Sequence, residues 1–336
     1  MDTHTHIVLG ACIGEAIAGQ KLGKKALLIG AVAQSLPDID FVASFWLPVS
    51  GDLLAHRGFT HSFLFAVLFT SLLAWASSKI FPKAGMTTRH WAIFWGLQLF
   101  IHLFIDAFNA YGTGWFEPFS HYRVSFNTMY VADPLFTLWP AAATVALVLL
   151  NKQSGKRKAW MTMALTLSSV YLVLGVFFKL SIDNKVKKEI ENKQVVSGRY
   201  FITPTPLNNL LWYIVAQNDS GYNIGYRSVF DKKEHIDFHF ARKNDALLIP
   251  VSKTTDVKNL VRFSKGYYSV QKWHDTLVFN DLRFGEITGW SEPNPKFVFY
   301  YFLQYPDANK LIVQRGRFAR WDKNTLTAFI RRIKGI

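Results

Sequence analysis

Clusters of histidine and carboxylate residues near the start of the chain have spacings that suit a metal ion. His102 and Asp106 stand four residues apart in a predicted helix, so both side chains lie on one helix face and can reach one ion. Asp2 and His6 have the same spacing. Neutral imidazole and carboxylate groups are ligands for Zn²⁺ and similar divalent ions. The other candidates in this part of the chain lie in four short segments: Asp38 and Asp40; His56, Arg57 and His61; Glu117, His121 and Arg123; and Asp133.

Cysteine chemistry is excluded as the basis of such a site. The chain has one cysteine, Cys12, inside an apolar segment, so any metal must be held by histidine and carboxylate. Ionisable groups at membrane depth cost roughly 2.5–3.5 kcal/mol on insertion scales and are therefore functional candidates. Each cluster also has a plainer explanation, because a buried His/Asp pair can be structural and Asp38 with Asp40 can cap a helix or a turn.

Long apolar runs indicate that the clusters belong to a membrane domain. A transmembrane helix needs about 20 mostly apolar residues, and four segments meet this criterion. Two earlier segments, 7–19 and 26–47, are short or interrupted by polar residues, and they either span or form a re-entrant hairpin. The predicted fold is an α-helical polytopic membrane domain of about six helices, followed by a small α+β soluble domain. The four clear segments are residues 59–78, 91–110, 131–150 and 160–180.

The distribution of Lys and Arg predicts the orientation of these helices. Basic residues are concentrated in the first, third and fifth connections, which are therefore expected in the cytoplasm. The N-terminus, the even connections and the C-terminal part are then expected on the other side. All the His/Asp clusters fall on that face, although none of them was used to derive it, which predicts a single site at the non-cytoplasmic surface. The basic residues are Lys21, Lys24, Lys25, Lys79, Lys83, Arg89, Lys152, Lys156, Arg157 and Lys158.

A change of pattern near residue 181 divides the chain into three predicted parts. Residues 1–180 form the membrane domain, 181–197 a Lys/Glu-rich helical linker, and 198–336 an extramembrane α+β domain with no role assigned. His235 and His239 flank strand-like residues and are interpreted as incidental. Short aromatic and β-branched runs between Pro, Asn and Gly turns predict strands, and a helix is predicted to follow them. The strands are 199–201, 210–216, 222–230, 267–270 and 296–302, and the helix is 325–333.

The basic balance of the chain does not indicate nucleic-acid binding. Lys and Arg number 38 against 23 Asp and Glu, which gives a net charge of +15. Residues 1–180 hold 13 basic and 8 acidic residues, and 181–336 hold 25 and 15, so no dense basic block stands out. Loop charges that set topology and contact anionic lipid explain the excess, and membrane lipid is the predicted partner.

Several clusters resemble the motifs of a bacterial family of membrane-bound, metal-dependent hydrolases that includes LexA-regulated inner-membrane members. The sequence has Pro-Asp-x-Asp at 37–40 and His-Arg-Gly-x-Thr-His-Ser at 56–62, which is the most specific element. The resemblance covers about residues 1–135 and implies an inner-membrane location, a bound metal and hydrolysis. His4 stands where the family has an apolar residue, so no role is assigned to it. The remaining elements are Met-Asp-x-x-Thr-His at 1–6, His-x-x-x-Asp at 102–106, and Pro-Phe-Ser at 118–120 followed by Arg123.

A fainter similarity to zinc-dependent phospholipase C implies a phosphoester substrate. It rests on the order of the elements, which is His, Pro-Asp, His-Ser and His-x-x-x-Asp. This similarity implies that the metal is zinc and that His6 and Asp106 can bind a second ion. The predicted ligands are His6, Asp38, Asp40, His56, His61, His102 and Asp106.

The resemblance thus implies metal-dependent hydrolysis of a phosphoric ester in a lipid or a membrane-proximal molecule. A divalent ion lowers the pKa of a bound water to near 7 and polarises a phosphoryl oxygen. Asp2, or one of the pair Asp38 and Asp40, is predicted as general base. Arg57 and Arg123 lie on the site face, where they either hold a phosphate by bidentate hydrogen bonds or contact lipid headgroups.

Two other functions are compatible with the same residues. An ion transporter would use intramembrane His and Asp as an ion path, but the ionisable residues gather near one face instead of running through the bilayer. A non-enzymatic membrane protein would carry a structural metal. A fully ligated site would favour this function, whereas an open coordination position favours catalysis. The substrate, the number of metals and the oligomeric state are not predicted.

Overall fold

A computed structural model of the chain describes residues 1–193, 199–292, 295–309, 318 and 321–336. The structure divides into two compact units, each described by itself below. The division falls at Gly175, inside a long helix and close to the boundary predicted at residue 180, and residues 194–197 of the predicted linker lie outside the described residues. The first unit comprises Met1–Ala43, Ala55–Gly175 and Pro206–Asn208, and the second Ser44–Leu54, Val176–Thr205 and Asn209–Ile336.

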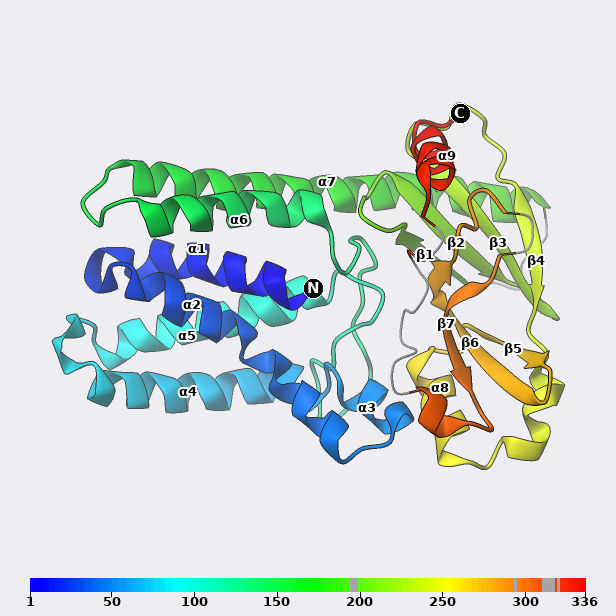
Figure 1. Ribbon diagram of the computed structural model, residues 1–336, viewed down its shortest axis with the longest axis horizontal. Helices are drawn as coiled ribbons and strands as arrows, with labels where there is room; N and C mark the ends of the chain where they lie inside the picture. The colour runs from blue at the N-terminus through cyan, green and yellow to red at the C-terminus, as the bar shows by residue number, and fades with distance from the viewer. Residues whose placement is uncertain (194–198, 293–294, 310–317, 319–320) are drawn as a thin grey trace. The chain divides into compact units, whose positions relative to one another are not determined.

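The first unit is helical, as predicted, and its long helices run side by side (Figure 1). Polar residues fix where they begin: Asp2 caps α1 by accepting from Thr5 N, and Ser62 caps α4 by accepting from Phe65 N. The α-helices are α1 (Thr3–Leu22), α2 (Lys25–Ser35), α4 (Phe63–Ile80), α5 (Thr88–Asp106), α6 (Pro134–Leu149) and the first part of α7 (Lys156–Lys193), with the 3₁₀ helices η1 (Pro37–Phe45), η2 (Phe59–His61) and η3 (Pro82–Ala84) between them; α3 (Val49–Ala55) belongs mostly to the second unit.

Helices α1 and α2 approach closely because glycines line their contact. A Cβ atom added at Gly14 would lie 2.2 Å from the carbonyl oxygen of Ala26, and one at Gly30 would lie 2.2 Å from that of Gly10. Gly10 and Gly14 have the Gly-x-x-x-Gly spacing that permits close backbone approach between membrane helices. The contact therefore depends on the absence of side chains at these positions.

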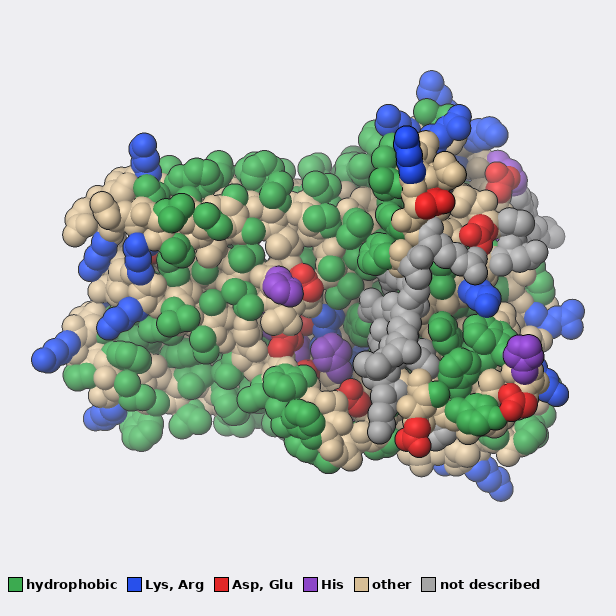
Figure 2. Space-filling model, viewed as in Figure 1, with side chains coloured by type: hydrophobic (Ala, Val, Ile, Leu, Met, Phe, Trp, Pro, Cys, Tyr) green, Lys and Arg blue, Asp and Glu red, His purple; other side chains and the backbone are tan. Residues whose placement is uncertain are grey.

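The end of the helical unit opposite the N-terminus carries the basic connections. The α1–α2, α4–α5 and α6–α7 connections lie together there (Figure 1), and Lys and Arg side chains gather on that end (Figure 2). A buried ion pair joins the helices at the start of α7: Arg157 donates to Glu15 through Nε at 2.8 Å and Nη2 at 2.7 Å. The grouping of the three connections agrees with the predicted topology, while the side of the membrane they face stays a prediction.

The described residues include two helices long and apolar enough to cross a membrane, α4 and Lys156–Glu191 of α7. Helix α2 and η1 together form a third candidate, bent by 53° at their break, which fits the interrupted segment predicted there. Helix α6 is apolar but has only 16 residues. The exposed surface of these helices is largely hydrophobic (Figure 2). A membrane domain is supported, and the count of about six spans stays a prediction.

The second unit contains two antiparallel sheets, which confirms the β-structure predicted after residue 198. Five strands lie near the predicted runs, the predicted closing helix is α9, and β4, β6 and α8 were not predicted. The sheets have the orders β1-β2-β3-β4 and β5-β6-β7. The elements are β1 (Tyr200–Pro204), β2 (Leu211–Gln217), β3 (Gly221–Ser228), β4 (Phe238–Arg242), η4 (Asp245–Val251), α8 (Thr255–Phe263), β5 (Tyr268–Trp273), β6 (Thr276–Glu286), β7 (Phe297–Phe302), η5 (Pro306–Asn309) and α9 (Lys323–Ile333).

The end of α7 packs on the first sheet and forms a core with it. Ile182 and Val186 of α7 are buried against Ile202, Trp212 and Ile214. Ile202 of β1 and Ile214 of β2 are paired in the sheet register. The predicted helical linker is therefore a continuation of the last helix of the first unit, held in the second unit by its apolar face.

Candidate metal centre

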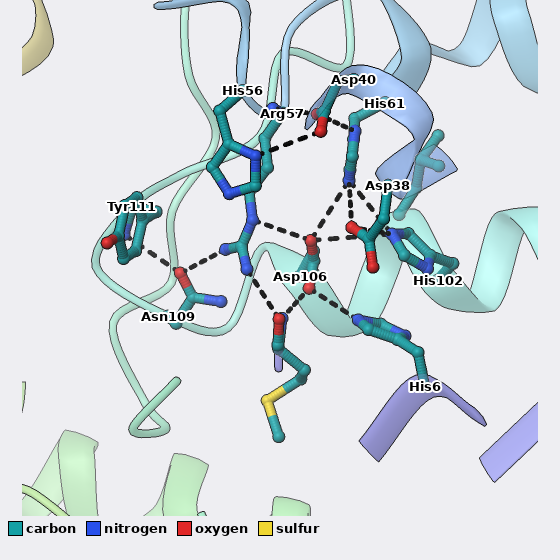
Figure 3. Close-up of polar contacts among 12 residues, drawn as sticks. His6, Asp38, Asp40, His56, Arg57, His61, His102, Asp106, Asn109 and Tyr111 are labelled. Atoms are coloured by element: carbon teal, nitrogen blue, oxygen red, sulfur yellow. Dashed lines mark hydrogen bonds and ion pairs between the residues drawn. The ribbon is translucent and has the colours of Figure 1, made fainter. Parts of the chain in front are cut away.

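Short and long helices of the first unit bring the predicted His and Asp residues to one place (Figure 3). The α5 spacing predicted from the sequence is present, with His102 and Asp106 in its last two turns. Next to them lie the 3₁₀ helices η1 and η2, which contain the Asp38, Asp40 and His61 side chains. The contributing residues are His6 of α1, Gln34 of α2, Asp38 and Asp40 of η1, His61 of η2, and His102 and Asp106 of α5.

Four of these residues form a group with the geometry of a metal site. Asp38, His61, His102 and Asp106 each offer one ligand atom, and these atoms all lie within 4.8 Å of one another. The Nε2 atoms of His61 and His102 are 3.0 Å apart. His61 Nε2 is 3.5 Å from Asp38 Oδ1 and 3.4 Å from Asp106 Oδ2, and His102 Nε2 is 3.6 and 3.7 Å from the same two atoms.

Acceptors behind the rings determine which imidazole nitrogen carries the proton. His102 Nδ1 lies 2.5 Å from the carbonyl oxygen of Gln34, and His61 Nδ1 lies 3.3 Å from Asp40 Oδ2. The Thr60 hydroxyl, 3.1 Å from His61 Nδ1, can donate or accept, whereas the Gln34 carbonyl and the Asp40 carboxylate only accept. We therefore assign the proton of each neutral ring to Nδ1 and its lone pair to Nε2. Metal-binding histidines are oriented in this way by acceptors on their second nitrogen.

His6 also has an acceptor on its Nδ1 atom and directs its Nε2 atom at Asp106. The amide nitrogen of Gln34 donates to the carbonyl of Gln98 at 2.9 Å, which leaves Gln34 Oε1 as the acceptor for His6 Nδ1 at 3.2 Å. His6 Nε2 then points its lone pair at Asp106 Oδ1, 3.0 Å away. The His6 and His102 rings stack with centroids 3.8 Å apart. The Nε2 atoms of three imidazoles thus converge on one buried carboxylate, which the amino group of Met1 also contacts.

This arrangement fits the predicted divalent metal. Lone pairs at hydrogen-bond distance from one another and from carboxylate oxygens repel unless a cation lies between them. Among the described residues, Asp38 Oδ2 is a buried atom with no hydrogen-bond partner, while Asp106 Oδ2 has no hydrogen bond but lies 3.0 Å from Arg57 Nε. Two imidazole nitrogens and two carboxylate oxygens are a donor set that Zn²⁺ and similar ions accept. The residues present therefore suit a divalent cation without fixing its identity.

Arg57 holds Asp106 from the other side. Its Nε lies 3.0 Å from Asp106 Oδ2, Nη1 donates to Asn109 Oδ1 at 2.7 Å, and Nη2 donates to the carbonyl oxygen of Met1 at 2.9 Å. The amino group of Met1 contacts Asp106 Oδ1. The Arg57 side chain is buried, so its interactions are with the protein and not with solvent.

Asp40 and His56 lie beside the four-residue group and not in it. Asp40 Oδ2 accepts from Arg57 N at 2.6 Å, and Asp40 Oδ1 lies 3.2 Å from Nδ1 of His56. The His56 side chain is 39% exposed, whereas His61 is fully buried. Both residues were predicted as ligands; the structure gives Asp40 the position of an acceptor behind His61 and places His56 at the rim.

The other predicted site residues are placed outside the group. Asp2 caps α1 and accepts from Thr5, and Arg123 donates to the carbonyl oxygen of His56. His121 pairs with Glu117 at 2.9 Å on the surface. The last candidate, Asp133, caps α6 and accepts from the Tyr171 hydroxyl at 2.8 Å.

Neutral amides of the site were missed from the sequence. The side chain of Gln34 accepts from His6, and its backbone carbonyl accepts from His102. Gln34 donates to the backbone carbonyl of Gln98, whose own side chain donates to the carbonyl of Gly10 at 3.0 Å. Asn109 accepts from Arg57. The available signal was the presence of Gln34 and Gln98 inside apolar runs, since polar groups at membrane depth need partners.

Comparisons with known proteins agree with a membrane location. The model of the family described as YdjM inner membrane protein matches residues 1–182. The chain is 30% identical over 203 residues to the uncharacterized protein YfhP of Bacillus subtilis (strain 168), covering 56% of this chain and 57% of that relative. It is 34% identical over 122 residues to the inner membrane protein YbcI of Escherichia coli (strain K12), covering 35% of this chain and 68% of that relative.

The matched family model spans the first unit, its site and the start of α7. The chain spans little more than half the length of YfhP, the first of these relatives. No solved structure matches the chain. Neither the family description nor the names of the relatives state an activity, so the implied hydrolysis and the similarity to phospholipase C stay predictions. Because the family model covers more than half of the chain, together with its apolar helices, the chain belongs to the YdjM inner membrane protein family.

Proposed function

We propose that this protein is a membrane-bound, metal-dependent hydrolase of phosphoric esters. The observation that carries the proposal is the convergence of the Nε2 atoms of His61 and His102 with carboxylate oxygens of Asp38 and Asp106 inside 4.8 Å. A bound divalent ion would supply a water of lowered pKa and would polarise a phosphoryl oxygen. The remaining steps are assigned to residues of the chain.

Asp38 is the residue that opens the group to a substrate. Its side chain is 17% exposed, whereas His61, His102 and Asp106 are fully buried. With Oδ1 directed at the histidines, Oδ2 is itself a buried oxygen without a hydrogen-bond partner among the described residues, so it is free to accept from a water held by the metal. We assign to Oδ2 the proton of the attacking water, which is general-base catalysis. Four protein ligands would close a tetrahedral site, as structural sites do, so hydrolysis requires that the ion keep a position for water, either by a fifth ligand or by release of Asp38.

Asp2 and Asp40, the other predicted bases, have competing contacts. Asp2 caps α1, and both oxygens of Asp40 lie against donors. In the proposed mechanism Asp40 orients His61, and Arg57 holds Asp106 in place. The phosphate-holding role expected for Arg57 and Arg123 stays a prediction, and for Arg57 it competes with the contacts that position Asp106.

A lipid or membrane-proximal substrate is favoured by apolar residues beside the acids. Ile39 and Phe41 alternate with Asp38 and Asp40 in η1, and their side chains are 49% and 61% exposed. Exposed apolar groups next to a polar site suit a molecule with an apolar part and a charged head. Against the transporter alternative, the ligand atoms of the metal group lie within 4.8 Å of one another, whereas an ion path would place such groups in succession through the helices.

The test is hydrolysis by purified protein in detergent. Phosphatidic acid and a diacyl phosphodiester are supplied as lipid substrates, and bis-p-nitrophenyl phosphate as a soluble one, before and after chelation and Zn²⁺ addition. We expect metal-dependent release of product from a lipid ester, lost in Asp38→Asn and retained in His4→Ala, since His4 is exposed and outside the group. Full metal occupancy with no hydrolysis of any of the three esters would refute the enzymatic function and favour the structural-metal alternative.

A further inference from the structure

A cavity of about 580 Å³ lies in the second unit and has no part in the function proposed above. It is a partly open cavity lined by residues of β3, of β4 and of the connection between them, by the turn after β6, and by the end of α9 with the residues that follow it. Its volume is in the range of about 300–1,000 Å³ that is typical of small-molecule sites. All its lining residues belong to the second unit, so the cavity exists within that unit alone.

Basic residues dominate the charges that remain free around this cavity. Lys232 and Lys233 are adjacent and exposed, and neither forms an ion pair with any residue that the structure describes. The lining carboxylate of Asp231 is neutralised, since Arg332 donates to its two oxygens at 2.6 and 2.9 Å. Lys and Arg side chains also gather over α9 (Figure 2). Asp237, whose side chain is 94% exposed, is the remaining acidic side chain of the lining, and the carboxylate of Ile336, the last residue of the sequence, is a second negative group there.

One wall of the cavity is a buried polar array. Glu286, 1% exposed, accepts from the Tyr226 hydroxyl at 3.0 Å and from His239 Nε2 at 2.8 Å. Glu286 raises the pKa of His239, so protonated His239 and Glu286 form a neutral pair at this wall. Gly289 leaves the room for this array, because a Cβ atom there would lie 2.3 Å from the Tyr226 hydroxyl and 2.4 Å from Glu286 Oε2.

Trp290 supplies an aromatic surface and a hydrogen-bond donor. Its ring is held by Phe329 of α9, with centroids 4.5 Å apart, and by Tyr226 at 6.5 Å. Its indole Nε1 is buried and has no hydrogen-bond partner among the described residues. A buried donor without an acceptor is costly, and a ligand oxygen would remove that cost.

We propose that this cavity binds a small organic phosphate, with the phosphate on Lys232 and Lys233 and the organic part packed on Trp290. A phosphate monoester carries close to two negative charges at neutral pH, which matches two adjacent ammonium groups better than a single carboxylate does. Trp290 accounts for the organic part, since a flat or sugar ring packs on an aromatic face and brings acceptor oxygens to the indole N–H. His235 and His239, interpreted as incidental in the sequence, both line the cavity.

Calorimetric titration of the full chain in detergent tests this proposal, with adenosine 5′-monophosphate, glucose 6-phosphate and inorganic phosphate as probes. We expect at least one organic phosphate to saturate a single site per chain and inorganic phosphate to compete for it. The double charge reversal Lys232→Glu with Lys233→Glu should weaken binding at least about tenfold, because each charged hydrogen bond contributes roughly 1.5–3 kcal/mol. Trp290→Ala should weaken the organic phosphates more than inorganic phosphate.

Two controls separate this site from general charge effects and from the metal centre. Lys253→Glu with Lys258→Glu makes the same change of net charge outside the cavity lining and should leave binding within about twofold. His102→Ala, which disrupts the metal group, should also leave it unchanged. The proposal is overturned if none of the three probes saturates, if both charge reversals weaken binding equally, or if binding is lost in His102→Ala and kept in the Lys232/Lys233 variant.

Discussion

The Nε2 atoms of His61 and His102 lie 3.0 Å apart in a buried space, and each ring has an acceptor on its far nitrogen. Because Asp40 and the Gln34 carbonyl fix the protons on Nδ1, the two facing nitrogens present lone pairs to each other. Such a pair is unfavourable by itself and favourable around a cation. The sequence motifs at 56–62 and 102–106 each contribute one of the two facing nitrogens, so a single cation would bind both motifs.

Asp40→Asn tests the orienting role of Asp40. An amide accepts less well from His61 Nδ1 and from Arg57 N, so the His61 ring should lose its fixed tautomer. We expect metal affinity to fall about 10–100-fold, which is typical of lost acceptors behind metal ligands. Competition with a chromophoric chelator measures the change, and Asp237→Asn is the matched control, because that side chain is 94% exposed and lies in the second unit. Unchanged affinity in Asp40→Asn would remove Asp40 from the site.

Arg57→Leu tests whether Arg57 supports the fold or only the chemistry. Arg57→Leu removes the guanidinium partner of buried Asp106 and leaves the Met1 amino group as its remaining cation, so we expect a loss of roughly 3–5 kcal/mol in the free energy of unfolding. The loss should persist in metal-free protein. Denaturant unfolding in mixed micelles measures it, and Arg89→Leu, at an exposed position, should change stability by less than about 0.5 kcal/mol. Equal stability of the two variants would contradict the structural role.

Gly30→Ala tests the close contact of α1 and α2. The new Cβ atom would lie 2.2 Å from the Gly10 carbonyl oxygen, so the helices must separate, and His6 must move away from Gln34. We expect a loss of about 1–3 kcal/mol in stability, as for other overpacked sites, together with weaker metal binding. Gly96→Ala is the control, because its Cβ atom would meet nothing nearer than 3.5 Å. A Gly30→Ala protein as stable as Gly96→Ala would mean that the contact is looser than described.

The His239–Glu286 pair predicts a pH dependence in the second unit. Glu286 raises the pKa of His239 above its ordinary value of 6.5, so protonation favours the folded state. The stabilisation is complete below the unfolded pKa and is lost as pH rises through the folded pKa. We expect strands β3 and β4 to lose hydrogen-exchange protection, corrected for intrinsic rates, from pH 6 to pH 8. His239→Gln should flatten this dependence and His4→Gln should not; the same slope in all three proteins would exclude the pair as its source.

The ligands of the group were predictable because their residue types and spacing are visible in the sequence. Asp38, His61, His102 and Asp106 are all among the predicted ligands. Ligand and supporting acceptor could not be told apart for Asp40, since the distinction depends on which way neighbouring rings point. The amides that orient the histidines carry no titratable group, and only their position inside apolar runs marked them.

Strand β6 shows the same limit in the second unit. Its interior contains Asn280, Asp281 and Arg283, all buried, so its sequence lacks the apolar alternation that predicts a strand. Arg283 Nη2 lies 2.6 Å from Asp281 Oδ2, and this ion pair makes burial of both charges tolerable. Pairing of this kind depends on tertiary structure and cannot be predicted from local patterns.

The central claim is a divalent metal held by Asp38, His61, His102 and Asp106, and metal analysis tests it most directly. Protein purified in detergent and exposed to Zn²⁺, then freed of excess ion, is compared with His102→Ala, Asp106→Ala and the control His4→Ala. The account predicts one tightly bound ion per chain in the wild type and in His4→Ala, and loss of that ion in the other two variants. Stoichiometric metal that persists in both His102→Ala and Asp106→Ala would contradict it.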